Sequence, residues 1–311
     1  MTIRVTLLAG GTGGARLALG MQDVLPPGAL TVITNTADDV EMWGLRVCPD
    51  TDAVLFRLAG IFDERRGFGV VDDTHTVLDQ MRDLAEDAWF WLGDRDTAFH
   101  ILRTTLLRRG ARLTEAIDEL GRRLRLPTRV LPMSDDDVRT FFDTAAGRFP
   151  FQEYFVRERL AHPLRGIEFE GLDAARPTPE VTAAVEGADV VVIGPSNPLI
   201  SIAPITGLIG GLLRPESTVA VTPLVGGLAL KGPTVEMLRT LRGRATPEQV
   251  AEEYRGMAGW FVLDQVDGAR AAAVERVGCR VLKTDTVMRD APGARRLATA
   301  ILSEMLGVRG R

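Results

Sequence analysis

The chain has 311 residues, of which 45% are hydrophobic and 25% charged, the proportions of a folded globular protein rather than a disordered one. Its formal net charge of −5 argues against broad binding to nucleic acid or to anionic membranes. Its two cysteines, Cys48 and Cys279, are too few for a disulfide framework or a structural zinc site.

Seven short runs of mainly apolar, often β-branched residues are expected to form strands. They are Ile3–Ala9, Leu30–Asn35, Thr128–Pro132, Val190–Gly194, Val219–Thr222, Trp260–Leu263 and Cys279–Lys283. Several are apolar throughout, which is typical of parallel strands covered on both faces. The first run leaves no room for a signal peptide, and no apolar run reaches the ~20 residues that cross a bilayer. We therefore expect a cytoplasmic protein that does not enter a membrane.

Helical patterns lie between these runs, at Ala15–Val24, Val77–Leu84, Ala98–Arg109, Thr114–Leu124, Pro179–Glu186, Pro247–Tyr254, Ala269–Val277 and Ala294–Leu306. This alternation predicts an α/β fold with a mainly parallel sheet. Residues from about 51 to 125 are mostly helical, and we interpret them as a helical layer inserted between two strands. Because no Pro- or Ser-rich linker interrupts the chain, residues 1–311 are expected to form a single domain.

A glycine-rich turn directly follows the first strand and opens a helix. Its glycines allow a ligand to approach the backbone, and the helix N-terminus offers free N–H groups to a phosphate. The pattern is neither a full dinucleotide fingerprint nor a P-loop, because Arg16 replaces the third glycine and no Gly-Lys-Ser/Thr is present. A tight strand–helix turn is the structural alternative. We predict phosphate binding by Gly10, Gly11, Thr12, Gly13 and Gly14.

Polar residues also follow three other strands, and the carboxyl ends of parallel strands meet at one edge of a sheet. We therefore predict that these residues share the crevice of the glycine-rich turn: Asn35, Thr36, Ser134, Asp135, Gly194, Ser196 and Asn197. The first of these segments could instead form an Asx turn, and Ser134 could belong to a capping box.

Two acidic motifs lie in the helical stretch. Asp50 and Asp52, one residue apart, could hold a hard cation that bridges diphosphate oxygens, or Asp50 or Thr51 could simply cap a helix that starts near Asp52. Farther on, Arg95 lies between Asp94 and Asp96 and could clamp a phosphate or join an ion-pair network. The adjacent Trp91 could pack within the helical layer or border a planar ligand.

Taken in order, these motifs strongly resemble the 2-phospho-L-lactate transferase family of coenzyme F-420 biosynthesis. The motifs are Gly-Gly-Thr-Gly-Gly-Ala-Arg, Asn-Thr-Ala-Asp-Asp, Gly-Leu-Arg-Val-Cys-Pro-Asp-Thr-Asp, Leu-Gly-Asp-Arg-Asp, Leu-Pro-Met-Ser-Asp-Asp and Gly-Pro-Ser-Asn-Pro. The resemblance runs from about Ile3 to Met288 and implies a Rossmann-like fold. The third motif looks like that of the bacterial phosphoenolpyruvate transferase branch, for which an enolpyruvyl donor is expected. Archaeal relatives often have a basic residue where this chain has Trp91.

The resemblance implies an Mg²⁺-dependent transfer of a 2-phospholactyl or phosphoenolpyruvyl group. The donor would be a guanosine-diphosphate-linked acid, the acceptor the ribityl hydroxyl of the deazaflavin Fo, and GMP the leaving product. Implied roles are catalysis by Asp50, Asp52 and Arg95, and metal binding by Asp50 and Asp52. Acceptor binding falls to Asp52, Trp91, Asp94 and Asp96, and donor binding to the glycine-rich turn and the polar strand ends. We further expect a homodimer.

Two other functions remain open at this stage. One is a nucleotide-binding regulatory relative of the same superfamily that lacks Fo transferase activity. The other is a non-catalytic nucleotide-binding module, since the glycine-rich turn alone predicts no chemistry. Whether Asp52 would act as a general base, a metal ligand or both is likewise open.

Overall fold

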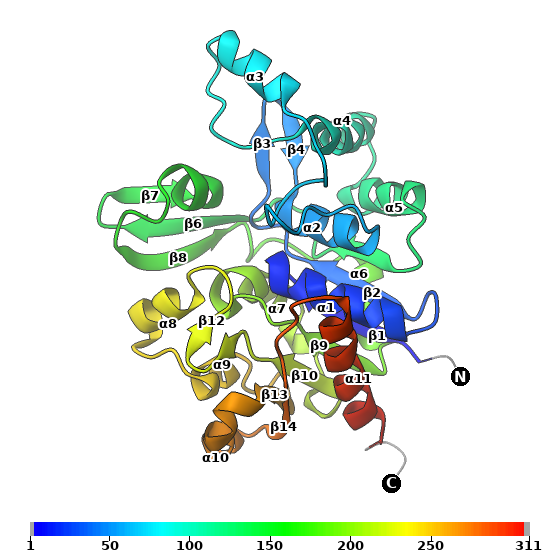
Figure 1. Ribbon diagram of the computed structural model, residues 1–311, viewed down its shortest axis with the longest axis vertical. Coiled ribbons are helices and arrows are strands. Elements are labelled where there is room, and N and C mark those ends of the chain that lie inside the picture. The colour runs from blue at the N-terminus through cyan, green and yellow to red at the C-terminus, as the bar shows by residue number, and fades with distance from the viewer. Residues whose placement is uncertain (1–2, 308–311) are drawn as a thin grey trace.

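The computed structural model describes residues 3–307 and is built around a twisted sheet (Figure 1). Within that range, seven strands pair in parallel in the order β14-β13-β10-β9-β1-β2-β5. The strands are β1 (Val5–Ala9), β2 (Leu30–Thr34), β5 (Arg129–Pro132), β9 (Val190–Ile193), β10 (Thr218–Val221), β13 (Trp260–Asp264) and β14 (Arg280–Thr284). Each predicted run forms one of them, which confirms the α/β fold.

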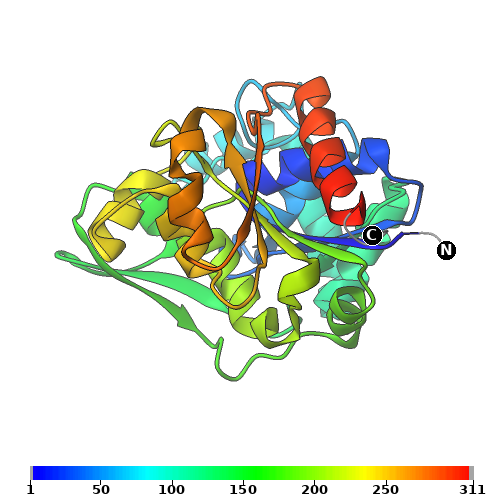
Figure 2. The ribbon, with the colours of Figure 1, turned by 90° about the horizontal axis from the view of Figure 1, so that it is seen from below.

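Both faces of this sheet are covered, because alternate residues of each strand enter different apolar clusters. Leu7 of β1 packs with one cluster and Leu8 with the other. Figure 2 shows α1 and α11 on one face and α6 and α7 on the other. The helices of the first cluster are α1 (Gly11–Val24), α2 (Pro49–Leu58), α5 (Leu113–Arg123) and α11 (Ala291–Gly307). Those of the second include α6 (Pro179–Glu186), α7 (Ala203–Ile209), α8 (Thr234–Arg242), α9 (Pro247–Glu253) and α10 (Ala271–Glu275).

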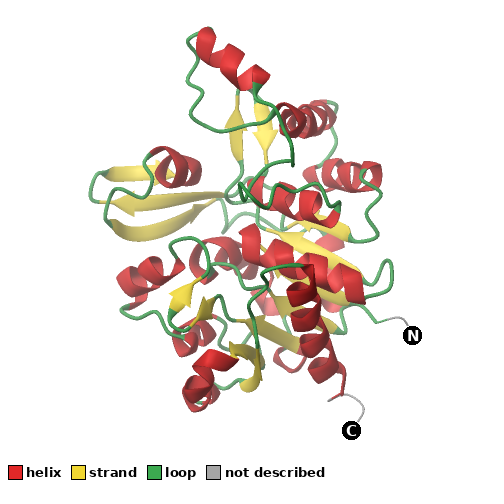
Figure 3. Ribbon diagram, in the orientation of Figure 1, coloured by secondary structure: helices red, strands yellow, loops and turns green. Residues whose placement is uncertain are grey.

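An arm of helices rises from the sheet between β2 and β5 (Figures 1 and 3). It opens with an antiparallel hairpin of β3 (Val40–Met42) and β4 (Leu45–Val47). The helices α2, α3 (Thr76–Asp83), α4 (Asp94–Arg108) and α5 follow. The helical stretch thus begins at Pro49 rather than near Asp52, because proline fits the first helical position, where no N–H needs a partner.

A second, antiparallel sheet lies beside this arm and was not anticipated from the sequence (Figure 3). It contains β6 (Arg139–Thr144), β7 (Gly147–Pro150) and β8 (Leu164–Glu170), and a π-helical turn at Glu153–Arg157 packs against it. Phe142 is fully buried against Phe151 and Tyr154. A short hairpin of β11 (Leu224–Val225) and β12 (Leu228–Ala229) precedes α8 and was not anticipated either.

β1 lies at the point in the sheet where the order in which the chain adds its strands reverses. The chain runs outward from β1 to β2 and β5, and then returns to lay β9 on the other side of β1. In open parallel sheets, ligands bind outside the carboxyl ends of the strands at such a point. The turns after β1 and β9 therefore meet where a ligand site is expected. Among residues 3–307, no helix combines the length and apolar character needed to span a membrane.

Candidate active site

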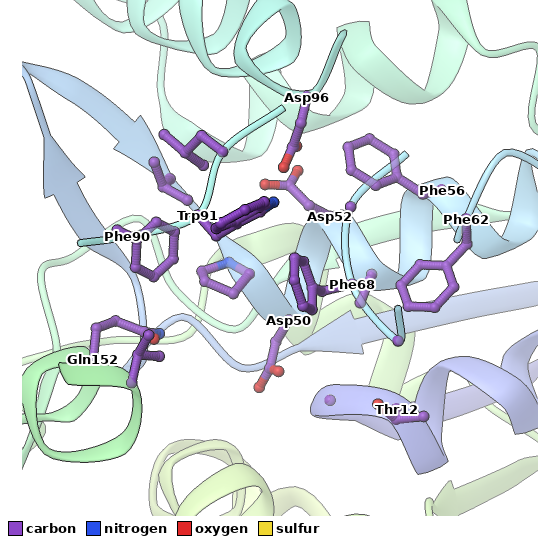
Figure 4. A pocket seen from close by; sticks show the side chains of 18 of the residues that line it. Thr12, Asp50, Asp52, Phe56, Phe62, Phe68, Phe90, Trp91, Asp96 and Gln152 are labelled. Atoms are coloured by element: carbon purple, nitrogen blue, oxygen red, sulfur yellow. The ribbon is translucent and has the colours of Figure 1, made fainter. Parts of the chain in front are cut away.

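Two adjoining cavities open at this end of the sheet. The aromatic cavity, of about 280 Å³, extends into the helical arm (Figure 4). The strand-end cavity, of about 560 Å³, lies over the turns that follow β1 and β9. The residues that line both are Gly11, Thr12, Pro49, Asp50, Gly67, Phe68 and Gln152. Both volumes suit a small-molecule ligand or a large part of one, so one molecule in each cavity could meet at the shared wall.

The glycine-rich turn forms the floor of the strand-end cavity. Gly10, Gly11, Thr12 and Gly13 line it, and Gly10 is the N-cap of α1, so the positive end of the α1 dipole faces the cavity. Gly14 has a packing role instead, since a Cβ there would lie 2.7 Å from the Cβ of Ala9.

The turn after β9 holds this floor in place. The Ser196 hydroxyl accepts hydrogen bonds from the Gly10 and Gly14 N–H groups and donates one to the Gly10 carbonyl. A Cβ at Gly13 would overlap the Pro195 carbonyl oxygen, so Gly13 permits a backbone contact as well as lining the cavity. Ser196 and Asn197 line the cavity, whereas Gly194 lies outside the lining and packs against Leu8.

Two buried carboxylates face the strand-end cavity. Asp38 follows β2 and Asp50 lies in the first turn of α2, and both line the cavity. Burial, and then the charge of Asp50, raise the pKa of Asp38 well above its ordinary value. Burial likewise raises the pKa of Asp50. Such raised pKa values mean that the two negative charges are poorly compensated, which favours a cation beside them.

Asn35 and Thr36 sit behind this pair rather than in the cavity. Asn35 is fully buried, donates from Nδ2 to Asp50 Oδ2 at 3.1 Å and accepts at Oδ1 from the Ala37 N–H. Thr36 is fully buried as well. The structure thus gives Asn35 the task of orienting Asp50, and the Asx turn coexists with that task.

Asp52 points away from Asp50, because residues two apart on a helix face different sides (Figure 4). Its carboxylate pairs with Arg103 of α4, whose side chain is fully buried. The charge of Asp52 raises the pKa of Arg103, although burial alone would lower it. Asp52 also lies 3.6 Å from His100 Nδ1. The structure therefore does not bring the carboxylates of Asp50 and Asp52 together around one cation.

Asp96 and His100 complete the polar end of the aromatic cavity. Both line it, and Figure 4 shows Asp96 opposite Asp52. Asp96 Oδ1 lies 3.2 Å from His100 Nε2, yet neither atom has a hydrogen-bond partner of acceptable geometry among the described residues. Asp73 fixes this corner by accepting hydrogen bonds from the Arg95 and Asp96 N–H groups at the start of α4. These two buried atoms make an ion-pair contact but no well-aligned hydrogen bond, so a polar group of a ligand in the cavity could supply one.

Aromatic side chains form the remaining walls of this cavity. They are Phe56, Phe62, Phe68, Phe90 and Trp91. Trp91 is 44% exposed and donates from Nε1 to His75 Nε2 at 2.6 Å, and Phe68 is 48% exposed. A flat aromatic ligand could stack between such rings, a contact of ~0.5–1.5 kcal/mol beyond the buried area.

Besides Gly14, Asn35, Thr36 and Gly194, four more predicted site residues lie outside the linings of both cavities. Ser134 donates to the Arg176 carbonyl, and Asp135 caps α5 through the N–H and hydroxyl of Thr114. Asp94 accepts from the N–H groups of Thr76 and Val77 at the start of α3. Arg95 is exposed and donates to the Val71 carbonyl. Each has its partners within the fold, so the structure does not bring them to the candidate site.

Several site residues were missed from the sequence. Asp38 belongs to the Asn-Thr-Ala-Asp-Asp motif, and the apolar strand before it was a usable signal. Arg103 lies seven residues after Asp96, hence two turns along the same helical face, which could have suggested an inward-facing cation. Phe68 and Lys231 lie in loops whose glycines were the one available signal. Among residues 3–307, no group of three or more His, Cys, Asp or Glu side chains is arranged to hold a metal ion.

Comparisons with known proteins identify the family of the chain. The family model described as "2-phospho-L-lactate transferase CofD" matches residues 5–305. The chain is 35% identical to a 2-phospho-L-lactate transferase of Methanosarcina mazei, over 95% of this chain and 98% of that one. It is 36% identical to a phosphoenolpyruvate transferase of Thermobifida fusca, over 87% and 89% of the two chains. Both kinds of relative thus match at nearly the same identity.

The fold has solved counterparts too. The crystal structure of a UPF0052 family protein from Bacillus halodurans superposes with a TM-score of 0.63, covering 97% of this chain and 99% of that one, at 16% sequence identity. That likeness supports the Rossmann-like α/β architecture alone. The family match over nearly the whole length, and relatives above 30% identity, carry the assignment further. The chain belongs to the 2-phospho-L-lactate transferase CofD family, as its motifs predicted.

Proposed function

We propose that this transferase moves a 2-phospholactyl or phosphoenolpyruvyl group from a guanosine-diphosphate-linked donor to the ribityl hydroxyl of Fo, releasing GMP in coenzyme F-420 biosynthesis. The observation that carries the proposal is Asp50, a buried carboxylate on the shared wall of a polar and an aromatic cavity. Donor in one and acceptor in the other would meet at this residue.

The strand-end cavity is the proposed donor site. The glycine-rich turn and the α1 N-terminus suit the diphosphate, and Ser196 and Asn197 add neutral hydrogen-bonding groups nearby. Asp38 and Asp50 fit Mg²⁺, which often binds through one or two carboxylates together with substrate phosphates. When bound there, Mg²⁺ would offset the charge of the diphosphate. This assignment replaces Asp52 with Asp38 as the partner of Asp50.

The aromatic cavity is the proposed acceptor site. Its ring walls suit the flat deazaflavin, and Asp96 and His100 offer unpartnered polar atoms to an O–H or N–H on the ring edge. The ribityl chain would then extend toward Asp50, whose carboxylate accepts a hydrogen bond from the attacking hydroxyl and orients it. Phosphoryl transfer needs mainly such positioning and charge neutralisation.

The test of this function is a direct assay of the purified protein. Incubation with Fo, Mg²⁺ and either the lactyl- or the enolpyruvyl-diphosphoguanosine should give a new phosphodiester of Fo and an equal amount of GMP, both visible by mass spectrometry. The donor that turns over faster is the preferred one. GDP binding without any product from either donor would instead favour the regulatory relative, and no binding of GDP or Fo would contradict both.

The poorly compensated Asp38 and Asp50 lead to a prediction about Mg²⁺ and pH. Because folding raises the pKa of both groups, the metal-free protein is stabilised while they are protonated, and it loses that stability as the pH rises through the raised pKa values. Mg²⁺ binds the deprotonated pair, so its effect on Tm should be large near pH 7.5 and small near pH 5. At a concentration about 100 times its Kd, Mg²⁺ should add about 2.7 kcal/mol.

Thermal unfolding of the wild type and of Asp38→Asn, with and without Mg²⁺, checks this expectation. Asp38→Asn should lose most of the Mg²⁺ effect at the higher pH. An equal Mg²⁺ effect at both pH values, or one that survives in Asp38→Asn, would place the metal elsewhere.

The unpartnered Asp96 leads to a prediction about the acceptor. Asp96→Asn should raise the KM for Fo by roughly 10- to 100-fold while leaving kcat nearly unchanged, since a hydrogen bond to a charged group contributes about 1.5–3 kcal/mol. Asp94→Asn is the matched control, because it removes a charge two residues away that does not line the cavity. Steady-state kinetics with varied Fo checks this, and equal KM values for Asp96→Asn and the wild type would remove Asp96 from the acceptor site.

A further inference from the structure

The basic residues of this chain are almost all arginines. Of its 37 lysine and arginine residues, two are lysines, Lys231 and Lys283. Lys231 follows the β11–β12 hairpin and lines the strand-end cavity, whereas Lys283 is an exposed residue of β14 that does not line it. A lysine ammonium is a compact point charge that serves well at phosphates. Lys231 is therefore a distinctive cation at the proposed donor site.

Lys231 belongs to a cluster in which positive charge exceeds negative charge. Arg16 and Arg57 share the carboxylate of Glu64, at 2.9 Å and 2.7 Å respectively. Partial burial, and then the nearby charges of Arg16 and Arg57, lower the pKa of Lys231. Three cations thus surround a single carboxylate, and both Arg16 and Lys231 line the cavity. An anion placed there would relieve this repulsion.

Lys231 also touches the loop that carries Phe68. Its ammonium group lies so close to Gly67 that a Cβ at that position would come within 2.6 Å of Nζ. Gly67 and Gly69 have φ values of +83° and +72°, which bulkier residues rarely adopt, and they flank Phe68. On the other side of the contact, Gly227 and Gly232, at +76° and +70°, flank the segment that carries Lys231. Backbone hydrogen bonds to Asp63 hold Gly67 and Gly69, so the Phe68 side chain between them is the part of this loop that is free to reorient.

Phe68 follows Gly67 directly, so the contact between Lys231 and Gly67 can affect the position of its ring. It lines both cavities, and in the view of Figure 4 it lies between the rings of Trp91 and Phe62. Its 48% exposure leaves much of the ring free to cover a flat ligand. A loop fixed at Gly67 would hold Phe68 over the aromatic cavity, whereas a loose one would not.

We infer that Lys231 binds the phosphates of the nucleoside diphosphate donor and, through its contact with Gly67, orders the Phe68 loop, so that an occupied donor site tightens acceptor binding. This inference rests on the proposed function for the identity of the two ligands. The coupling is reciprocal, since two ligands that favour the same ordered state each raise the affinity of the other by the same factor.

The two lysines allow a test of the phosphate contact with an internal control. Wild-type protein is treated with an amine-reactive reagent, with and without saturating GDP and Mg²⁺, and labelling is followed by mass spectrometry. GDP should slow the labelling of Lys231 several-fold and leave that of Lys283 unchanged. Equal labelling rates at Lys231, under conditions where GDP is bound, would overturn the phosphate contact.

The coupling is tested by binding Fo with and without GDP and Mg²⁺, followed by the fluorescence of the deazaflavin. Saturating GDP should lower the Kd for Fo about tenfold in the wild type, within the range common for coupled sites. That ratio should fall to near one in Lys231→Met and in Phe68→Ala, and it should stay at the wild-type value in Lys283→Met. Lys231→Arg, which keeps the charge, should recover part of it.

A wild-type ratio near one, or a full ratio in Lys231→Met at saturating GDP, would overturn the coupling. These outcomes differ from failure of the proposed function, in which wild-type protein forms no Fo phosphodiester from either donor.

Discussion

Replacing Asp50 with asparagine should lower the turnover of Fo at least ~100-fold, because a metal ion at a transferring phosphoryl group contributes several kcal/mol to transition-state stabilisation. Asparagine keeps the shape, and its side-chain oxygen can still accept from Asn35. It removes the charge that would bind Mg²⁺ and weakens the hydrogen bond that would orient the attacking hydroxyl. Single-turnover assays with saturating donor and Fo measure this loss directly. Asparagine has nearly the size of aspartate and removes a buried charge that is poorly compensated in the metal-free protein, so the variant should fold.

Asp38→Asn provides the matched comparison. Because Asp38 and Asp50 act as one pair, the double variant should be little slower than either single one, since groups that act as a unit are strongly non-additive. Fully additive losses would mean that the two carboxylates work separately. An Asp50→Asn enzyme that keeps most of its Mg²⁺-dependent activity would show that Asp50 does not take part in catalysis.

Replacing Arg103 with methionine should lower the free energy of unfolding by about 3–5 kcal/mol, the cost of leaving a buried charge without its partner. Arg103 is fully buried and Asp52 is 4% exposed, so the carboxylate left behind would lose its main counter-charge in a site with little solvent contact. Urea denaturation monitored by circular dichroism gives the value. The Asp52→Asn variant would strand Arg103 in the same way, so its activity alone cannot separate a catalytic role from a structural one.

Two further variants test whether the loss of stability in Arg103→Met comes from the broken ion pair with Asp52. Arg108→Met, on the exposed surface of the same helix, should change stability by no more than ~0.5 kcal/mol. The double variant Asp52→Asn with Arg103→Met should be more stable than Arg103→Met alone, because no charge is then left unpaired. Equal stabilities of Arg103→Met and the wild type would mean that the pair contributes nothing net.

The central sheet was predictable because parallel strands covered on both faces are continuous apolar runs. The inner strands are completely buried and rich in apolar residues, as in the Val190–Ile193 strand, whereas the edge strand β14 is only partly buried. The antiparallel sheet of β6, β7 and β8 was not predicted. One of its faces is open, so polar and charged residues such as Arg148 and Glu168 interrupt the pattern and pair with each other across the strands.

Within the site, sequence spacing predicted which segments meet better than which side chains meet. The glycine-rich turn and the turn after β9 were predicted to adjoin, and Ser196 joins them. Two carboxylates one residue apart, such as Asp50 and Asp52, can bind one cation where the backbone is not helical. The helix starts at Pro49, and its geometry turns the two carboxylates apart. The partner of each, Asp38 and Arg103, comes from a distant element that spacing alone does not reveal.

The two cavities also differ in how widely their lining residues are spread along the sequence. Apart from Gly11, Thr12, Gln152 and Val156, every lining residue of the aromatic cavity lies in one continuous segment, from Val47 to His100. The strand-end cavity draws its walls from turns spread between Gly10 and Met288. Acceptor preference could therefore diverge among descendants through substitutions in a single stretch of sequence, while nucleotide handling stays fixed by the whole scaffold. A chimera that exchanges this stretch with a relative should inherit the relative's choice of acceptor and keep its own choice of nucleotide.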